Sequence, residues 1–243
     1  TSSVVAEAVR ATRGLVLTGD DGQLCDTRFS KCCGGVTERF STCWQDNDPS
    51  YLQPVRDDAS AAPADLSAEE AARQWILSSP QSACHTNDAN LLRQVLNDYD
   101  REATPDFFRW TVHFTQEEIS RIIAEKREED FGQIIDLVPV ERGASGRLKL
   151  LKIVGTRRTL TIGKELEIRR SLSTTHLLSS AFVVERGPLK DGIPESFTLR
   201  GAGWGHGVGL CQIGAAAMSA EGYGYQQILE RYYHNALLKK LYE

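Results

Sequence analysis

Residues 201–214 read G-A-G-W-G-H-G-V-G-L-C-Q-I-G, and this glycine-rich run is the most distinctive feature of the 243-residue chain. Six of its fourteen residues are glycine, with Trp204 and His206 held between them. Glycine is this frequent where the backbone turns through positive φ or closely approaches a ligand or another segment. The run therefore predicts a tight turn. It serves either a functional site or only the close packing of a core Trp and a His that caps the turn.

A helix is expected to follow the glycine-rich run. Its signals are Leu210, Ile213, Ala217 and Met218 at helical spacing and Gly222 at the position of a C-terminal cap. The spacing predicts a helix over residues 208–221. Free N–H groups in its first turn would face the glycine-rich run, where they could hold developing negative charge or sugar hydroxyls.

Two blocks of the sequence resemble a known family. The first is W-G-H-G-V-G-L-C-Q-I-G-A at residues 204–215, followed by A-E-G-Y-G-Y-Q-Q-I-L-E-R-Y-Y at residues 220–233. It closely resembles the C-terminal signature of the stage II sporulation protein D family, which includes the amidase-enhancer domains. The second block is similar to the family's middle region, in the same order: A-V-R-A-T-R-G-L-V-L at 8–17, F-S-K-C-C-G-G-V-T-E at 29–38 and Y-L-Q-P-V-R-D-D at 51–58.

The resemblance implies an activity on bacterial peptidoglycan. Members of the family are secreted or membrane-anchored, and the best understood are lytic transglycosylases for glycan strands stripped of their peptides. We therefore expect glycan-strand cleavage that leaves anhydromuramic ends. The expected partners are the glycan strands, with a cell-wall amidase as a further candidate. The alternative is a non-enzymatic glycan-binding or amidase-activating module.

The sequence departs from the family pattern at two points. The family's proposed catalytic glutamate lies on an N-terminal helix, in a segment of the form E-A-L-K-A-Q-A, and Glu7 does not occupy its position. The chain is therefore expected to supply most of the cleft without that glutamate, as a fragment of a longer protein or as a non-catalytic relative. In addition, Cys32, Cys33 and Cys211 stand where the family usually has small hydroxyl or similar residues.

Glu38 and His206 are the candidate catalytic residues. In a lytic transglycosylase one carboxylic acid protonates the glycosidic oxygen, and the C6 hydroxyl of muramic acid then attacks the anomeric carbon, unlike the usual pair of carboxylates. Glu38 follows the tight C-C-G-G turn, although a carboxylate is more often a plain solvated charge. His206 would orient the substrate or a partner carboxylate. The candidate substrate-binding residues are Trp204, Gln212, Cys33, Gly34, Gly35, Trp44 and Tyr225.

The six cysteines favour disulfides over a metal site. No C-x-x-C pair occurs, and the adjacent Cys84 and His85 do not have the usual ligand spacing, so neither a metal nor a cofactor is expected. The candidate disulfides, if the two glycine turns meet at one cleft, are Cys32 or Cys33 with Cys211, and Cys43 with Cys84. The alternatives are burial as small hydrophobic residues, or a nucleophilic pair of Cys33 or Cys211 with His206.

Composition limits the class of protein. The chain is 41% hydrophobic and 25% charged, which is ordinary for a globular protein. Its net charge of −5 argues against nucleic-acid binding, which needs a basic patch. No run of 18 apolar residues occurs, so no membrane span is expected. Cysteine usage and the resemblance together predict an extracytoplasmic location, in the periplasm or cell envelope or as a secreted protein.

Residue patterning predicts an α+β fold of mixed helices and antiparallel sheets over residues 1–243. The expected strands are 107–114, 132–141, 148–154, 159–162, 181–185 and 197–200, and a hairpin is expected to join 15–17 to 24–30. The expected helices are 68–77, begun by a capping box of Ser67 and Glu70, then 89–100, 115–126, 165–172 and 225–233. Residues 104–184 are expected to form an inserted β-rich lobe.

Overall fold

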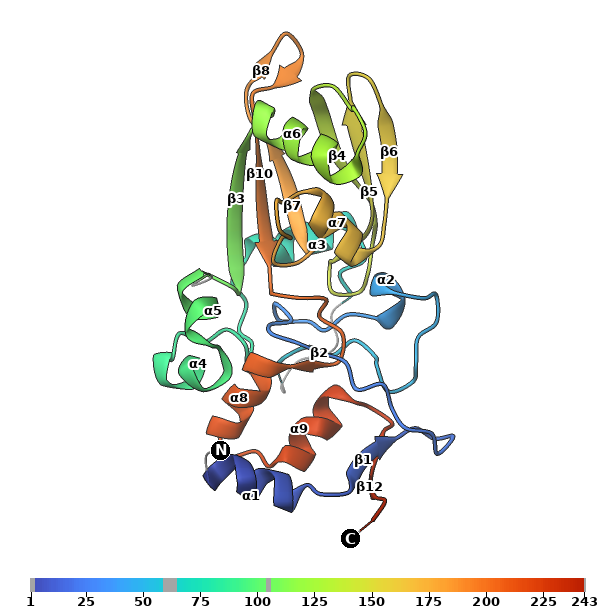
Figure 1. Cartoon of the computed structure of the whole chain (residues 1–243), viewed down its shortest axis with the longest axis vertical. Coiled ribbons are helices and arrows are strands. Elements are labelled where there is room, and N and C mark those ends of the chain that lie inside the picture. The colour runs from blue at the N-terminus through green and yellow to red at the C-terminus, as the bar shows by residue number, and fades with distance from the viewer. Residues whose placement is uncertain (1–2, 59–64, 104–105, 243) are drawn as a thin grey trace.

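The computed structural model describes residues 3–58, 65–103 and 106–242, which fold into two lobes (Figure 1). Helices alternate with small sheets, nearly all of them antiparallel, and this confirms the predicted α+β class. The upper lobe in Figure 1 holds both three-stranded sheets, and the lower lobe holds both ends of the described chain. Within the described residues, no helix is long and apolar enough to cross a membrane.

The upper lobe consists of residues 109–202. One sheet has the order β3–β10–β7, formed by Arg109–Thr115, Ser196–Ala202 and Phe182–Arg186. The other has the order β4–β5–β6, formed by Ile134–Arg142, Leu148–Gly155 and Thr159–Ile162. The lobe also contains α6 (Gln116–Arg127), α7 (Glu165–Ser171) and a short hairpin of β8 (Leu189–Lys190) and β9 (Ile193–Pro194).

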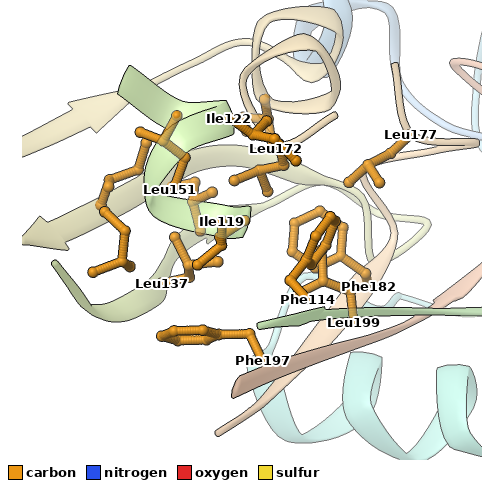
Figure 2. Close-up of a cluster of buried hydrophobic side chains, with 14 of the residues drawn as sticks. Phe114, Ile119, Ile122, Leu137, Leu151, Leu172, Leu177, Phe182, Phe197 and Leu199 are labelled. Atoms are coloured by element: carbon orange, nitrogen blue, oxygen red, sulfur yellow. The ribbon is translucent and has the colours of Figure 1, made fainter. Parts of the chain in front are cut away.

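Buried side chains of both sheets and of α6 form the core of the upper lobe (Figure 2). Along β3 the buried residues include Trp110 and Phe114, as the alternation of a half-buried strand requires. Helix α6 begins with a capping box between Thr115 and Glu118, which satisfies two free N–H groups at its start. The helix is thereby placed with Ile119 in the core between the sheets.

The upper lobe is longer than the predicted 104–184. Residues 104 and 105 lie outside the described residues, so the lobe is given from β3 onward. Strand β10 lies between β3 and β7 and pairs with both, with Gly201 opposite Trp110. The lobe therefore extends to residue 202 and includes the start of the glycine-rich run.

The lower lobe combines segments that are distant in sequence. Its N-terminal part contains α1 (Ser3–Ala11), β1 (Leu15–Thr18), β2 (Phe29–Ser30) and α2 (Phe40–Cys43). Its middle part contains α4 (Ala89–Val95) and α5 (Asp98–Ala103). Its C-terminal part contains β11 (Leu210–Cys211), α8 (Gln212–Ala220), α9 (Tyr225–Tyr232) and β12 (Leu237–Lys240). Helix α3 (Glu69–Leu77) packs against β7 and β10 through a small core of its own.

Several predicted elements of the lower lobe are wrong. Strand β1 pairs along its length with β12, and the expected hairpin is reduced to an antiparallel bridge between Thr18 and Leu24 and a hydrogen bond of 2.9 Å from the Cys25 N–H to the Leu17 carbonyl. The predicted helix 89–100 is two helices, α4 and α5. Helix α3 has Ala68 at its N-cap without a side-chain cap, so the capping box that we expected there does not form.

Helix α8 also starts later than residue 208. Leu210 and Cys211 are extended instead, because they pair in parallel with Phe29 and Ser30 of β2. The N–H group of Ile213, in the first turn of α8, donates to the carbonyl of Lys31 at 3.1 Å. Through this N–H group the first turn of the helix binds the backbone beside β2.

Candidate functional site

The glycine-rich run is a tight backbone structure, as its composition predicts. Gly203, Gly205, Gly207 and Gly209 all have positive φ, between 72° and 96°, which residues with a Cβ rarely adopt. Their backbone also comes close to other segments: Trp204 exchanges backbone hydrogen bonds of 2.8 and 3.1 Å with Cys32. The run and the C-C-G-G turn therefore meet, as expected if both belong to one site.

Arg147 lies at the centre of this meeting point and is completely buried. Its Nε donates to the carbonyl of Gly205 at 3.1 Å, and its Nη1 donates to the carbonyl of Cys33 at 3.1 Å and to Ser145 Oγ at 2.9 Å. A side chain at Gly207 would overlap the guanidinium group, so the glycine leaves the space that Arg147 fills. Its Nη2 has no hydrogen-bond partner among the described residues.

Glu38 lies next to Arg147 and is also completely buried. Its carboxylate accepts hydrogen bonds from the Arg39 N–H at 2.7 Å, the Ser145 N–H at 3.1 Å and Ser145 Oγ at 2.6 Å. Burial raises the pKa of Glu38 above its usual value, and the hydrogen bonds and the charge of Arg147 offset this only in part. The carboxyl group thus has the raised pKa of a general acid, but it does not reach the protein surface.

His206 is half-buried and accepts a hydrogen bond at Nδ1 from the Val208 N–H at 3.1 Å. Its ring stands edge-on to Trp44, with ring centroids 4.9 Å apart. Burial lowers the pKa of His206 to about 4, and the charges of Arg147, Arg169 and Arg28 add to this effect. The imidazole is therefore neutral at physiological pH and caps the turn, which is one of the two roles that the sequence left open.

The two tryptophans of the predicted site are half-buried and are each covered by a cation. Lys31 Nζ lies 4.1 Å from the ring of Trp204, and the guanidinium carbon of Arg28 lies 4.4 Å from the ring of Trp44. Such cation–π contacts stabilise the position of a ring. The structure thus brings Trp44 together with His206, and Trp204 with the C-C-G-G turn.

The C-C-G-G turn itself is buried and structural. The Gly34 carbonyl accepts hydrogen bonds from Trp75 Nε1 and Arg109 Nη1, both at 3.2 Å. The Gly35 carbonyl accepts the Asp57 N–H at 2.9 Å. Cys33 is 2% exposed, so neither its thiol nor the two glycines form the wall of an open cleft.

Gln212 and Tyr225 line an open groove of about 540 Å³, which we call the aromatic groove. Its lining residues come from β1 and β12, from β2 and the loop before it, from β11 and the first residue of α8, and from α9. Phe29 and Tyr225 are 58% and 46% exposed there, so their rings are available to a ligand. The remaining lining residues are Thr12, Leu15, Val16, Leu17, Leu24, Cys25, Thr27, Leu210, Leu229, Tyr233 and Leu238.

Three residues of these sites were not predicted from the sequence: Phe29, Arg147 and Ser145. Phe29 carried a signal, because it alternates with Cys25 and Thr27 on one face, and all three line the aromatic groove. Arg147 and Ser145 carried none, because an Arg after a Gly-rich turn usually extends into solvent. Only the arrangement of the two lobes shows that both side chains are buried.

The cysteines do not form the disulfides that we expected. All six are free thiols, and the sulfur of Cys43 lies 3.6 Å from the carbonyl oxygen of His206. Cys32 and Cys33 do lie close to Cys211, as the meeting of the two glycine turns requires. The imidazole of His206 is bonded to the Val208 N–H and makes no described contact with the thiols of Cys33 or Cys211.

Comparison with known proteins places the chain in a family. A search of the curated proteins finds no match to the chain. The family model described as a domain of unknown function, DUF8618, matches residues 38–209. The two ends of the matched region lie side by side, because Glu38 pairs with Val208 in a parallel bridge. The match covers well over half of the sequence, and the chain therefore belongs to the DUF8618 family of domains of unknown function.

Proposed function

We propose that the chain binds peptidoglycan glycan strands in the aromatic groove and takes part in their cleavage by a lytic transglycosylase reaction. The groove carries the proposal, because the exposed rings of Phe29 and Tyr225 lie in it together with the amide of Gln212. A glycan presents apolar ring faces edged by hydroxyl and N-acetyl groups. Aromatic rings and an amide side chain are the groups suited to bind such a ligand. The resemblance to the stage II sporulation protein D family adds support from the sequence.

The proposed reaction needs one carboxylic acid, which protonates the glycosidic oxygen of the leaving group and then, as the carboxylate, accepts the proton of the C6 hydroxyl that attacks the anomeric carbon. Glu38 is the candidate within this chain, because its burial raises its pKa. However, none of the described residues that line the aromatic groove is Asp or Glu, and Glu38 is sealed against Ser145. This observation favours a second candidate function, a glycan-binding or amidase-activating module whose groove holds the strand without cutting it.

The test is to incubate the chain with purified glycan strands, with and without stem peptides, and to analyse the products by mass spectrometry. A parallel pull-down measures retention of the strands. We expect retention by the wild-type chain and a roughly tenfold weaker affinity when Tyr225 or Gln212 is replaced by Ala. Tyr223→Ala is the matched control, because Tyr223 is an exposed tyrosine outside the groove.

Three outcomes are distinct. Anhydromuramic ends that disappear in Glu38→Gln identify Glu38 as the acid and support cleavage by this chain. Retention without cleavage, lost in Tyr225→Ala, supports the binding module. If the wild-type chain neither retains nor cleaves glycan strands, or if Tyr223→Ala weakens retention as much as Tyr225→Ala, the aromatic groove is not a glycan site.

A further inference from the structure

A cluster of thiols in the lower lobe has no part in the aromatic groove. Cys33, Cys84 and Cys211 lie together with the carboxylate of Asp57, and the four ligand atoms are all within 4.8 Å of one another. All four residues are buried, and the three cysteines belong to the core of the lower lobe. We refer to them as the thiolate cluster. Its members come from the C-C-G-G turn, two loops and the residue that caps α8.

The spacing of the sulfurs fits a shared metal ion and not a disulfide. The sulfurs of Cys33 and Cys84 are 3.7 Å apart, whereas a disulfide bond is about 2.0 Å long. In a tetrahedral zinc site with Zn–S bonds of about 2.3 Å, two sulfurs stand about 3.8 Å apart, because they occupy the ends of one tetrahedral edge. The observed separation matches the one that two thiolates adopt around a common zinc ion, and it is also that of two hydrogen-bonded thiols.

The surroundings of the sulfurs are those of metal-bound thiolates. The Cys33 N–H donates to Cys211 Sγ at 3.2 Å, and Ser82 Oγ lies 3.3 Å from Cys84 Sγ. Asp57 is held in place by the Cys84 N–H at 2.9 Å and by the hydroxyl of Tyr232. Hydrogen bonds of this kind orient the ligands of a metal site and stabilise charge on them.

Charge balance allows the same conclusion. Three thiolates and a carboxylate in an apolar core repel one another, and such a group is stable only with bound protons or with a cation among its members. A divalent cation replaces the protons of the three thiols, which pass to solvent when the metal binds. Thiolate ligands select soft or borderline metals such as zinc over magnesium or calcium.

We propose that Cys33, Cys84, Cys211 and Asp57 form a tetrahedral site for a structural zinc ion. The site supplies four protein ligands and is closed to solvent, so it leaves no position for a substrate. Its role is to join segments that are distant in sequence. Through Cys211 it fixes the start of α8 and hence Gln212, and through Asp57 and Tyr232 it fixes α9.

The sequence did not predict this site. Its ligands are spread over residues 33–211, and none is part of a C-x-x-C pair or a similar local motif. The expectation of no metal site therefore came from local spacing alone, and the fold brings the ligands together.

The first test is the metal content of the full chain, purified under reducing conditions without a chelator. We expect about one zinc ion per chain by elemental mass spectrometry. The metal-free reduced chain should bind Co²⁺ under anaerobic conditions, with the visible absorption of tetrahedral cobalt and sulfur-to-cobalt charge-transfer bands, and Zn²⁺ should displace it. Release of protons on Zn²⁺ binding, followed in weak buffer, reports on the thiols directly.

Substitutions identify the ligands. Cys84→Ser and Cys211→Ser should each lower zinc affinity by more than about tenfold. Cys43→Ser is the matched control, because Cys43 is also buried but does not belong to the thiolate cluster, and its sulfur lies against the carbonyl of His206. If the serine variants do not fold, the cobalt spectrum of the wild-type chain tests the site by itself.

The site is overturned if the reduced wild-type chain binds neither zinc nor cobalt, or if zinc remains bound when Cys84 and Cys211 are both replaced. A Cys33–Cys84 disulfide, found by mass spectrometry of the purified chain, would also overturn it. Cys32 is the other thiol close to Cys84 and Cys211. Loss of zinc in Cys32→Ser, with retention in Asp57→Asn, would overturn the assignment of the carboxylate as the fourth ligand.

Discussion

At the scale of single residues, His206 shows how burial fixes a protonation state. Its Nδ1 accepts the Val208 N–H, a role that only the unprotonated nitrogen can fill. Burial and the guanidinium groups of Arg147, Arg169 and Arg28 all disfavour the imidazolium. The backbone hydrogen bond to Phe29 acts in the opposite direction but is weaker. The residue thus holds the turn as a neutral acceptor.

This leads to a prediction about pH. The pKa of His206 is about 4 in the folded chain and 6.5 as its ordinary value, so the folded state binds the proton less well than the unfolded state. Its contribution to stability is therefore complete above pH 6.5 and is lost as the pH falls from 6.5 towards 4. At about 1.4 kcal/mol for each pKa unit, the loss has an upper limit of about 3 kcal/mol.

Urea denaturation of the wild-type chain and of His206→Gln at several pH values between 4 and 7 measures this effect. The wild-type chain should be the more stable at pH 7, and the difference should shrink as the pH falls, because Gln carries no titrating group. An NMR titration of the imidazole gives the pKa directly. A pKa near the ordinary value, or a stability difference that does not change with pH, would refute the prediction.

At the scale of elements, the need for glycine at position 201 in β10 comes from its neighbour in the sheet. It pairs with Trp110 on β3 and with Phe182 on β7, and a Cβ at this position would overlap the indole of Trp110. The Trp110 ring has no room to move, because its Nε1 donates to the Gly203 carbonyl at 3.0 Å and its side chain lies in the upper core. This glycine is needed for close packing, whereas Gly203 is needed for its positive φ.

We therefore expect Gly201→Ala to destabilise the chain by about 1–3 kcal/mol, the usual cost of overpacking. Arg200→Ala is the control on the same strand, since Arg200 is exposed, and its effect should stay within about 0.5 kcal/mol. In a double variant, Trp110→Phe should offset part of the Gly201→Ala cost, because the smaller ring vacates the overlapping space. If the losses of stability in the two single variants simply add up in the double variant, measured by thermal or chemical denaturation, the two side chains do not compete for the same space.

The same scale shows which elements the sequence could predict. Residues 159–162 were predicted as a strand and form β6, and Thr115 caps α6, because both signals are local to the chain. The partner of β1 was not predictable, because residues 15–18 pair with residues 237–240 and hydrophobic alternation does not identify a partner strand. Helix α8 began late for a related reason, since the pairing of Leu210 with Phe29 overrides helical propensity.

The candidate site was predictable to a similar extent. The glycine-rich run and the C-C-G-G turn meet, which was considered from the sequence only as a condition for a disulfide, and Gln212 and Tyr225 share one groove. Glu38 was expected at a cleft, but its side chain is buried against Ser145. A sequence pattern can place a carboxylate near a turn, but it does not show whether solvent reaches the carboxylate. Here the upper lobe covers Glu38 with the turn between β4 and β5.

At the scale of the whole molecule, the two lobes have separate main cores and are joined by polar contacts around Arg147 and by the small apolar core of α3. The core of the upper lobe draws only on residues 110–199, and that of the lower lobe on residues on either side of them. Arg147 extends from the upper lobe and donates to the carbonyls of Gly205 and Cys33 in the lower lobe. Ser145, in the same turn, donates to Glu38. A buried polar contact of this kind specifies one arrangement of the lobes, because each lost partner leaves a buried group unsatisfied.

The corresponding prediction is that Arg147→Met destabilises the contact between the two lobes and leaves the core of the upper lobe intact. Met fills much of the volume but donates no hydrogen bonds, so the carbonyls of Gly205 and Cys33 lose a buried partner at a cost of at least about 2 kcal/mol. Amide hydrogen exchange of the full chain should become faster at residues 31–38 and 203–209, while β5 and β6 keep their protection because their core is untouched. Arg121→Met, on the exposed face of α6, should leave exchange unchanged at both places. Uniformly faster exchange in Arg147→Met would mean that the two lobes unfold as one unit. Unchanged exchange would mean that the apolar contacts of α3 with β7 and β10 are sufficient to hold the lobes together.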